Sequence, residues 1–155
     1  LINDPELIIA DEPTTALDVT VQAQILNILN SLRKERKLSI LFISHDFGVI
    51  SQLCDRVIVM YAGSIVEEGP VKNIMQQAAH PYTSELIKCV PQLGNKEHAL
   101  HSIPGNPPSL NQLPEGCAFA NRCQYKQDQC LKESVPVSSK DNRSYKCFYP
   151  VGGTA

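Results

Sequence analysis

The apolar run at residues 7–10, LIIA, most limits what this chain can fold into. It contains no polar alternation and is followed directly by two acidic residues, Asp11 and Glu12. Such runs are typical of strands that are buried on both faces of a parallel sheet. A strand of this kind needs neighbours on both sides. We therefore expect that some neighbouring strands, which would come before residue 7 in the sequence, are missing from this chain.

Further apolar runs at residues 39–44 and 56–60 predict two more strands that could flank the first. Between the first two strands, apolar residues recur at helical spacing over residues 19–36, and Asp18 can cap that helix. The pattern predicts a βαβ unit and an α/β fold. After it we expect a short helix at residues 47–53, a hairpin turn at 61–64, a return strand at 64–67, and helices at 70–77 and 81–89.

Net charge and hydropathy exclude two classes of protein. The 155 residues carry 14 basic and 16 acidic side chains, a formal charge of −2, so no basic field is available for wrapping nucleic acid. No apolar run approaches the ~18 to 20 residues that a membrane-spanning helix needs. We expect no nucleic-acid partner.

Composition changes near residue 90. Seven of the 11 prolines lie from Pro91 onward, and the charge changes from −4 (7 basic, 11 acidic) in residues 1–90 to +2 (7 basic, 5 acidic) in residues 91–155. We expect a domain boundary there, followed by an irregular proline-rich stretch at residues 104–109. The segment beyond it has few large apolar residues for a core of its own, and these are Phe119, Tyr125, Val135, Phe148 and Tyr149.

Asp11 and Glu12 stand at the carboxyl end of the first predicted strand, where open α/β sheets bind ligands. If a nucleotide binds there, Asp11 can hold Mg²⁺ through water and Glu12 can polarise a water for attack on the γ-phosphate. The alternative is that the two carboxylates only open a solvated loop.

The full string LIIADEPTTALD at residues 7–18, followed by ISHD at residues 43–46, resembles the ABC-transporter ATPases. The resemblance implies a P-loop NTPase core in which Asp11 acts on Mg²⁺, Glu12 is the catalytic base and His45 contacts the γ-phosphate. It also implies that Asp18 touches the opposing subunit when ATP is enclosed.

The chain departs from that family in what it lacks. No G-x-x-x-x-G-K-[ST] phosphate loop, LSGGQ signature or glutamine loop occurs in the 155 residues. In the family these motifs precede the one at Asp11. We therefore expect a C-terminal portion of such an ATPase that does not bind ATP tightly or hydrolyse it alone. The exposed edge of its incomplete sheet predicts a dimer or a swapped assembly.

The remaining motifs are similar to those of the ATP-binding subunits of oligopeptide and dipeptide importers. They are RVIVMYAG at residues 56–63, IVE at 65–67, HPYT at 80–83, and IPG with two further prolines at 103–108. The resemblance implies a second ATPase subunit, two transmembrane permease subunits, an extracytoplasmic peptide-binding protein, and a peripheral place on the cytoplasmic face of the bacterial inner membrane. A repair or chromosome-maintenance ATPase would share residues 11–13 and the histidine but not these later motifs.

Four cysteines fall within one 31-residue stretch, with five, six and sixteen residues between them: Cys117, Cys123, Cys130 and Cys147. Without a secretory signal, such a cluster favours a metal site before two disulfides. Because the chain has no C-x-x-C pair, the spacing matches neither a zinc ribbon nor a ferredoxin. The importer resemblance implies a [4Fe-4S] cluster. Zinc, free thiols and disulfides stay open as alternatives, and a metal-binding or docking module is the alternative function for the whole chain.

Three other residues receive ordinary structural roles. Cys54 and Cys89 lie among apolar neighbours on predicted helices, where a thiol behaves as a small hydrophobe. His80 is expected to cap the helix that follows it. No role is assigned to His98 or His101.

Overall fold

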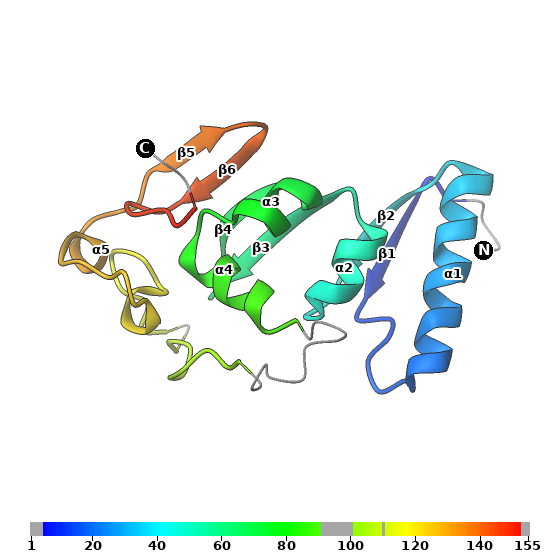
Figure 1. Cartoon of the computed structure of the whole chain (residues 1–155), viewed down its shortest axis with the longest axis horizontal. Helices are drawn as coiled ribbons and strands as arrows, with labels where there is room; N and C mark the ends of the chain where they lie inside the picture. Colours follow the sequence, from blue (N-terminus) through cyan, green and yellow to red (C-terminus); the bar gives the residue numbers. More distant parts are fainter. Residues whose placement is uncertain (1–4, 91–100, 110, 153–155) are drawn as a thin grey trace. The chain divides into compact units, whose positions relative to one another are not determined.

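A computed structural model describes residues 5–90, 101–109 and 111–152 (Figure 1). Its internal contacts divide the chain into two compact units, Leu1–Cys54 and Asp55–Ala155. Each unit is described below by itself. His98 lies within residues 91–100, outside the described residues. The expected boundary near residue 90 adjoins the same segment.

The first unit is the predicted βαβ arrangement with one more helix. Strand β1 (Leu7–Asp11) pairs in parallel with β2 (Ser39–Ile43), and helix α1 (Val19–Arg36) connects them. Helix α2 (Phe47–Leu53) follows β2 with the predicted bounds. Ile8 pairs with Ile40 and Asp11 with Ile43, so the carboxyl ends of both strands lie together.

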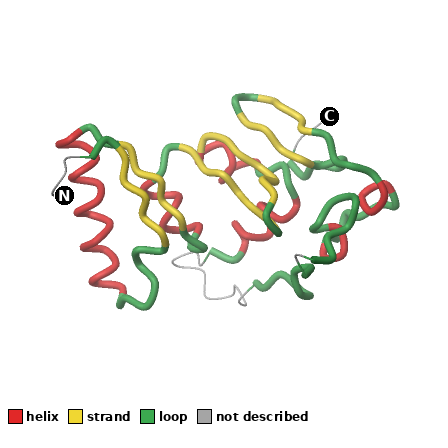
Figure 2. Tube along the Cα trace, turned by 180° about the vertical axis from the view of Figure 1, so that it is seen from behind, coloured by secondary structure: helices red, strands yellow, loops and turns green. Residues whose placement is uncertain are grey.

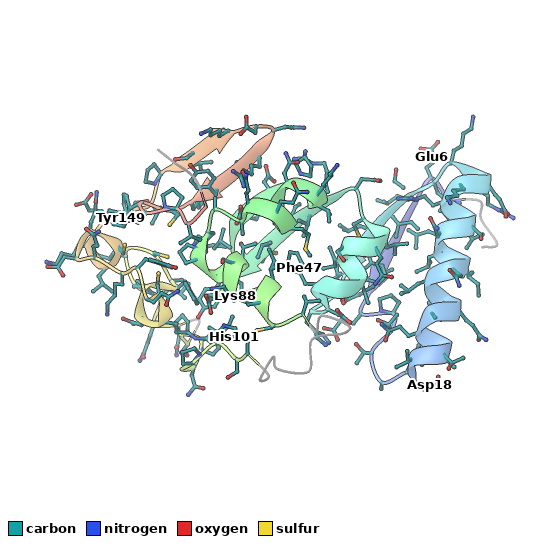
Figure 3. The ribbon with its side chains drawn as sticks, in the orientation of Figure 1. Glu6, Asp18, Phe47, Lys88, His101 and Tyr149 are labelled. Atoms are coloured by element: carbon teal, nitrogen blue, oxygen red, sulfur yellow. The ribbon has the colours of Figure 1, made fainter. Side chains whose placement is uncertain are left out.

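Helix α1 begins and ends where local chemistry requires. The Asp18 carboxylate accepts the backbone N–H groups of Thr20 and Val21, which is the predicted N-cap (Figure 3). Lys37 ends the helix in the left-handed region at φ 54°. The basic side chains of the last turn face the negative end of the helix dipole.

The prediction that β1 is buried on both faces is wrong for the described part of the chain. Leu7 and Ile9 are 53% and 63% exposed, and Leu41 and Ile43 beside them are also exposed. The opposite face, which includes Ala10, is buried or half-buried. The physical reason is that, among the described residues, no element packs on this face of the two-stranded sheet, so its apolar side chains stay exposed.

The second unit contains a four-stranded antiparallel sheet in the order β3-β4-β6-β5, built from two hairpins (Figure 2). Its strands are β3 (Arg56–Tyr61), β4 (Ser64–Pro70), β5 (Val137–Lys140) and β6 (Arg143–Lys146). The apolar run at residues 56–60 therefore pairs with β4 and does not flank β1. Ala62 and Gly63, with φ 46° and 80°, turn the chain back so tightly that the next strand pairs with it directly.

Helices α3 (Val71–Gln77) and α4 (Pro81–Lys88) follow β4 close to their predicted bounds. The short 3-10 helix η1 (Ala120–Arg122) and α5 (Gln129–Lys132) belong to the cysteine-bearing segment. The core of this unit includes the inward side chains of β3 and Ile74 of α3, which is fully buried. The division at residue 90 stays a prediction, although β4 pairs with β6 across it.

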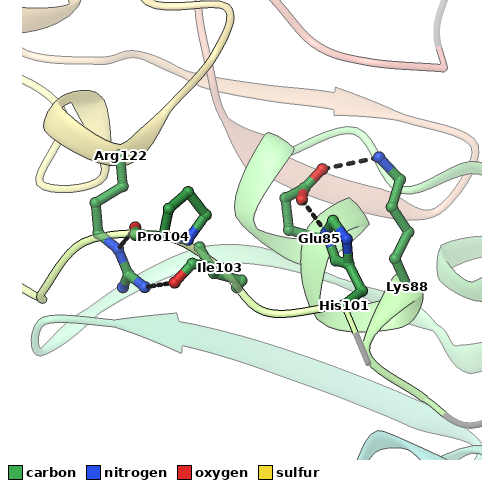
Figure 4. A network of polar contacts seen from close by, with 6 residues as sticks. All are labelled: Glu85, Lys88, His101, Ile103, Pro104 and Arg122. Atoms are coloured by element: carbon green, nitrogen blue, oxygen red, sulfur yellow. Dashed lines mark hydrogen bonds and ion pairs between the residues drawn. The ribbon is translucent and has the colours of Figure 1, made fainter. Parts of the chain in front are cut away.

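A polar network joins the proline-rich stretch to the rest of this unit (Figure 4). The Arg122 guanidinium donates to the carbonyl oxygens of Ile103 and Pro104. Nearby, Glu85 accepts from Lys88 at 2.8 Å and contacts Nε2 of His101 at 2.5 Å. Residues 104–109 are irregular, as predicted.

None of the described helices combines the length and the apolar character that crossing a membrane requires.

Candidate functional site

The two acidic residues lie where the sequence placed them, at the carboxyl end of β1. Asp11 is the last residue of that strand. Glu12 follows with φ 43°, a left-handed conformation that turns the chain out of the sheet. Its backbone N–H still donates to the carbonyl oxygen of Ile43 at 2.9 Å, so Glu12 is held at the end of both strands.

His45 and Thr15 hold the Glu12 carboxylate from two sides. His45 Nδ1 lies 3.1 Å from Oε1 of Glu12, although 33 residues separate the two in sequence. The Thr15 hydroxyl donates to Oε2 at 2.8 Å. The structure thus brings together the predicted base and the predicted histidine. The sequence analysis missed Thr15, which its place three residues after Glu12 could have suggested.

These contacts act on the charge of Glu12. The hydrogen bonds from His45 and then Thr15 lower the pKa of Glu12 below 4.5, although slight desolvation opposes them. The carboxylate is therefore ionised at neutral pH while its position is fixed. An ionised carboxylate held in this way can orient a water molecule by accepting its hydrogen bond.

Asp18 lies at the N-terminus of α1 and is exposed. Its Oδ1 atom accepts two backbone N–H groups of its own helix. This engagement fixes the carboxylate but leaves its second oxygen available to a partner. The role against an opposing subunit stays a prediction.

All four clustered cysteines line one pocket in the second unit. The pocket has an empty volume of about 330 Å³, part of which is open solvent. The five side chains expected to form a small core line it as well: Phe119, Tyr125, Val135, Phe148 and Tyr149. Phe119 is buried, as expected of a core residue, whereas Tyr125 is exposed.

Local backbone contacts bring the cysteines to this pocket from separate turns. The Cys117 N–H donates to the carbonyl oxygen of Cys130 at 2.8 Å, and the Cys123 N–H donates to that of Ala120. Gly116 permits the first contact, because a Cβ there would lie 2.2 Å from the Cys130 oxygen. Tyr149, labelled in Figure 3, donates from its hydroxyl to Gln129 beside Cys130.

The pocket opposes charge on its thiols. Burial raises the pKa of Cys117 and Cys123, and the neighbouring cysteines raise it further. Burial also raises the pKa of Cys147 to about 12, with added repulsion from the other three. Because metals bind the thiolate form, four thiolates are stable here only with a positively charged group among them.

His80 is a wall of this pocket that the sequence analysis described only as a cap. It does cap α4, since its Nδ1 accepts the Tyr82 N–H at 3.1 Å. Its ring is fully buried, and Nε2 lies 3.9 Å from Sγ of Cys117. Because these two residues are 37 positions apart, no local pattern indicates the contact.

All six cysteines lie in the described ranges, and none of them forms a disulfide. Across residues 5–90, 101–109 and 111–152, no three His, Cys, Asp or Glu side chains are arranged to hold a metal ion.

Comparison with known proteins matches residues 66–130 to the family described as "Oligopeptide/dipeptide transporter, C-terminal region". The chain is 48% identical over 150 residues to the probable D,D-dipeptide transport ATP-binding protein of Escherichia coli K12, covering 95% of this chain and 45% of that protein.

Two oligopeptide transport ATP-binding proteins are similar to the chain as well. The one from Salmonella typhimurium LT2 is 45% identical, covering 97% of this chain and 45% of the relative. The one from Haemophilus influenzae is 53% identical, covering 84% and 40%. The chain thus spans a little under half the length of these relatives. The resemblance to ATP-binding subunits of oligopeptide and dipeptide transporters is therefore confirmed over most of this chain.

Proposed function

We propose that this chain supplies part of the ATP-hydrolysing site of a bacterial importer of short peptides. Asp11 would hold Mg²⁺, Glu12 would be the catalytic base, His45 would contact the γ-phosphate, and Asp18 would meet the opposing ATPase subunit. The observation that carries the proposal is the 3.1 Å contact between His45 and Glu12 at the carboxyl end of two parallel strands.

The residues of the chain divide the work as follows. Glu12, ionised and held by His45 and Thr15, orients a water molecule and accepts its proton. His45 is 77% exposed in its side chain, so it can turn toward a phosphate while it remains near Glu12. Magnesium, when bound at Asp11, would neutralise charge on the phosphate oxygens.

The partners follow from the same family. We propose two permease subunits, a second ATPase subunit and an extracytoplasmic peptide-binding protein, with this chain on the cytoplasmic face of the membrane. Its 155 residues contain no phosphate loop or signature motif, so we expect neither tight ATP binding nor hydrolysis by this chain alone. Calorimetry with magnesium and ATP tests that expectation directly.

A chimaera tests the catalytic assignment. The 150 aligned residues of the E. coli relative would be replaced by this chain, so that the relative supplies the remaining segments. We expect the chimaera to hydrolyse ATP and Glu12→Gln to reduce its kcat at least about 100-fold, because the base is lost. Glu35→Gln, at an exposed position of α1, is the matched control. Equal activity of the two variants would contradict the assignment of Glu12.

For the second site we propose that Cys117, Cys123, Cys130 and Cys147 hold a [4Fe-4S] cluster. The support is that four thiols line one pocket, and that burial raises the pKa of Cys117, Cys123 and Cys147. When bound, the cluster would supply positive charge and a cross-link to a segment with little core. Its role in this arrangement is structural.

Anaerobic purification with iron, sulfide and zinc analysis tests the cluster. We expect about four iron and four sulfide per chain and an absorption band at about 400 nm. Cys123→Ser should reduce the iron content, whereas Cys89→Ser, outside the pocket, should not. A content of about one zinc per chain would show that the four cysteines bind zinc instead of a cluster. If no metal is found, the segment would be assigned as a docking segment with four free thiols.

A further inference from the structure

His80 is held in place by contacts that fix both its backbone and its ring. The Glu67 carboxyl group accepts the backbone N–H of Ala79 at 2.7 Å and of His80 at 2.9 Å. Glu67 and His80 are both fully buried. The ring also packs against Phe119, with 5.9 Å between ring centroids. The imidazole therefore has one orientation toward the pocket.

The hydrogen bond at Nδ1 decides which nitrogen carries the proton. The Tyr82 N–H donates to Nδ1, so Nδ1 must present a lone pair and cannot itself be protonated. A neutral imidazole with a free Nδ1 lone pair carries its proton on Nε2. Nε2 is the atom that faces Cys117 Sγ at 3.9 Å. The cap thus prepares the ring as a donor toward one sulfur.

We propose that His80 is a positioning residue of the cysteine pocket: its Nε2–H donates to Sγ of Cys117 and stabilises this thiolate as a cluster ligand. This inference rests on the cluster proposed above, although the contact itself does not need the cluster. Among the described contacts, Cys117 is also near backbone N–H donors at Phe119 and Ala120. Cys147 has such a donor at Tyr149 but no contact with His80. Cys147 is therefore the internal control.

Two substitutions separate the roles of the two ring nitrogens. In His80→Asn, the amide oxygen can still accept the Tyr82 N–H as an N-cap, but the side chain is too short to reach Cys117. In His80→Gln, the terminal amide can donate to Cys117 from near the position of Nε2, but the cap acceptor is lost. A role in capping alone predicts that His80→Gln is the more damaging change. If His80 acts as a donor to Cys117, His80→Asn should instead change the reactivity of Cys117 more than His80→Gln does.

The first measurement uses the reduced, metal-free 155-residue chain. Alkylation by iodoacetamide at fixed pH is followed by mass spectrometry at each cysteine. We expect His80→Asn to slow alkylation of Cys117 about threefold to tenfold, because its thiolate fraction falls, and His80→Gln to recover most of the rate. Cys147 should not slow in either variant, because a less charged Cys117 repels its thiolate less. General loosening of the pocket would instead accelerate both cysteines and would overturn the proposal.

Two further readouts keep the inference testable if a variant misfolds or if no cluster forms. In the unmodified chain, long-range ¹H–¹⁵N spectra should show a protonated Nε2 and an unprotonated Nδ1 at His80, and the opposite tautomer would overturn the proposal. In the cluster-loaded chain, His80→Asn should lower the reduction potential by up to ~59 mV. For one electron, this corresponds to a tenfold change in the ratio of reduced to oxidised cluster. An unchanged potential in His80→Asn would also overturn it. If the unmodified chain holds no cluster, the cluster assignment fails while alkylation and the tautomer still decide the role of His80.

Discussion

Oε2 of Glu67 accepts the backbone N–H of His80 at 2.9 Å, although both residues are completely removed from solvent. Oε1 accepts the preceding N–H, from Ala79, at 2.7 Å. One side chain of β4 therefore satisfies two buried donors in the connection between α3 and α4. This connection carries the histidine that faces the cysteine pocket.

We expect Glu67→Gln to lower the free energy of unfolding by about 1–3 kcal/mol, because its amide group would face a buried N–H donor. Urea denaturation of the second unit gives the value. The matched change Glu68→Gln, one position along on the less buried side, should cost under about 1 kcal/mol. Equal costs would show that the two buried N–H groups find other acceptors.

The charge of Glu12 offers a test by pH. Because His45 and then Thr15 lower its pKa below 4.5, the contacts favour folding above pH 4.5, and that contribution is lost as pH falls through the lowered value. Thr15→Val should raise the pKa of Glu12 toward 4.5, as followed by ¹³C NMR of the carboxyl carbon. Thr20→Val, on an exposed part of α1, should leave it unchanged.

Removal of the Asp18 cap should weaken the first unit. Asp18→Ala leaves the N–H groups of Thr20 and Val21 without their acceptor, at a cost of about 1 kcal/mol. Asp18→Ser should lower the free energy of unfolding by only a few tenths of 1 kcal/mol, since serine is also a good N-cap. Circular dichroism during urea unfolding distinguishes the two. An alanine variant as stable as the serine variant would mean that the cap contributes nothing.

Glu85 predicts acid sensitivity in the second unit. Burial raises its pKa, but hydrogen bonds from Lys88 and His101 outweigh burial, so the pKa lies below 4.5 in the folded chain. The resulting stability, about 1 kcal/mol, is present above pH 4.5 and is lost as pH falls through the lowered value. Glu85→Gln should flatten the stability profile below pH 4.5. An unchanged slope would contradict the prediction.

Gly116 tests how the pocket is assembled. A methyl group there would meet the Cys130 carbonyl oxygen at 2.2 Å and displace Cys117 from it. We expect Gly116→Ala to cost about 1–3 kcal/mol and to reduce iron content in the loaded chain. Gly63→Ala places its methyl in open space, so it should cost about 1 kcal/mol through its positive φ alone and retain iron.

Local chemistry made several elements predictable. The bounds of α1 followed from apolar spacing and from Asp18, which accepts N–H groups two and three residues away. The Asp46 cap of α2 was found only in the structure. Asp11 and Glu12 could be placed because they directly follow an apolar run.

Features that depend on distant residues were harder to predict. The exposure of Leu7 and Ile9 depends on what packs on that face of the sheet, which no window of sequence reports. The contact between His80 and Cys117 joins residues 37 positions apart, and Glu67 binds a loop 12 and 13 residues later. The five apolar residues expected as a core all line the pocket, and Phe119 is buried as predicted whereas Tyr125 is exposed, because composition does not distinguish a filled interior from a cavity wall.

Arg122 directly precedes Cys123, so its guanidinium and that sulfur share one short stretch of backbone. The guanidinium donates to the carbonyl oxygens of Ile103 and Pro104 and to the hydroxyl of Tyr61 on β3. Arg122 therefore links the backbone beside Cys123 to Tyr61, 61 residues away in sequence. A fluorescent or spin probe on β3 would test whether a chemical change at the cysteine pocket is transmitted through this side chain.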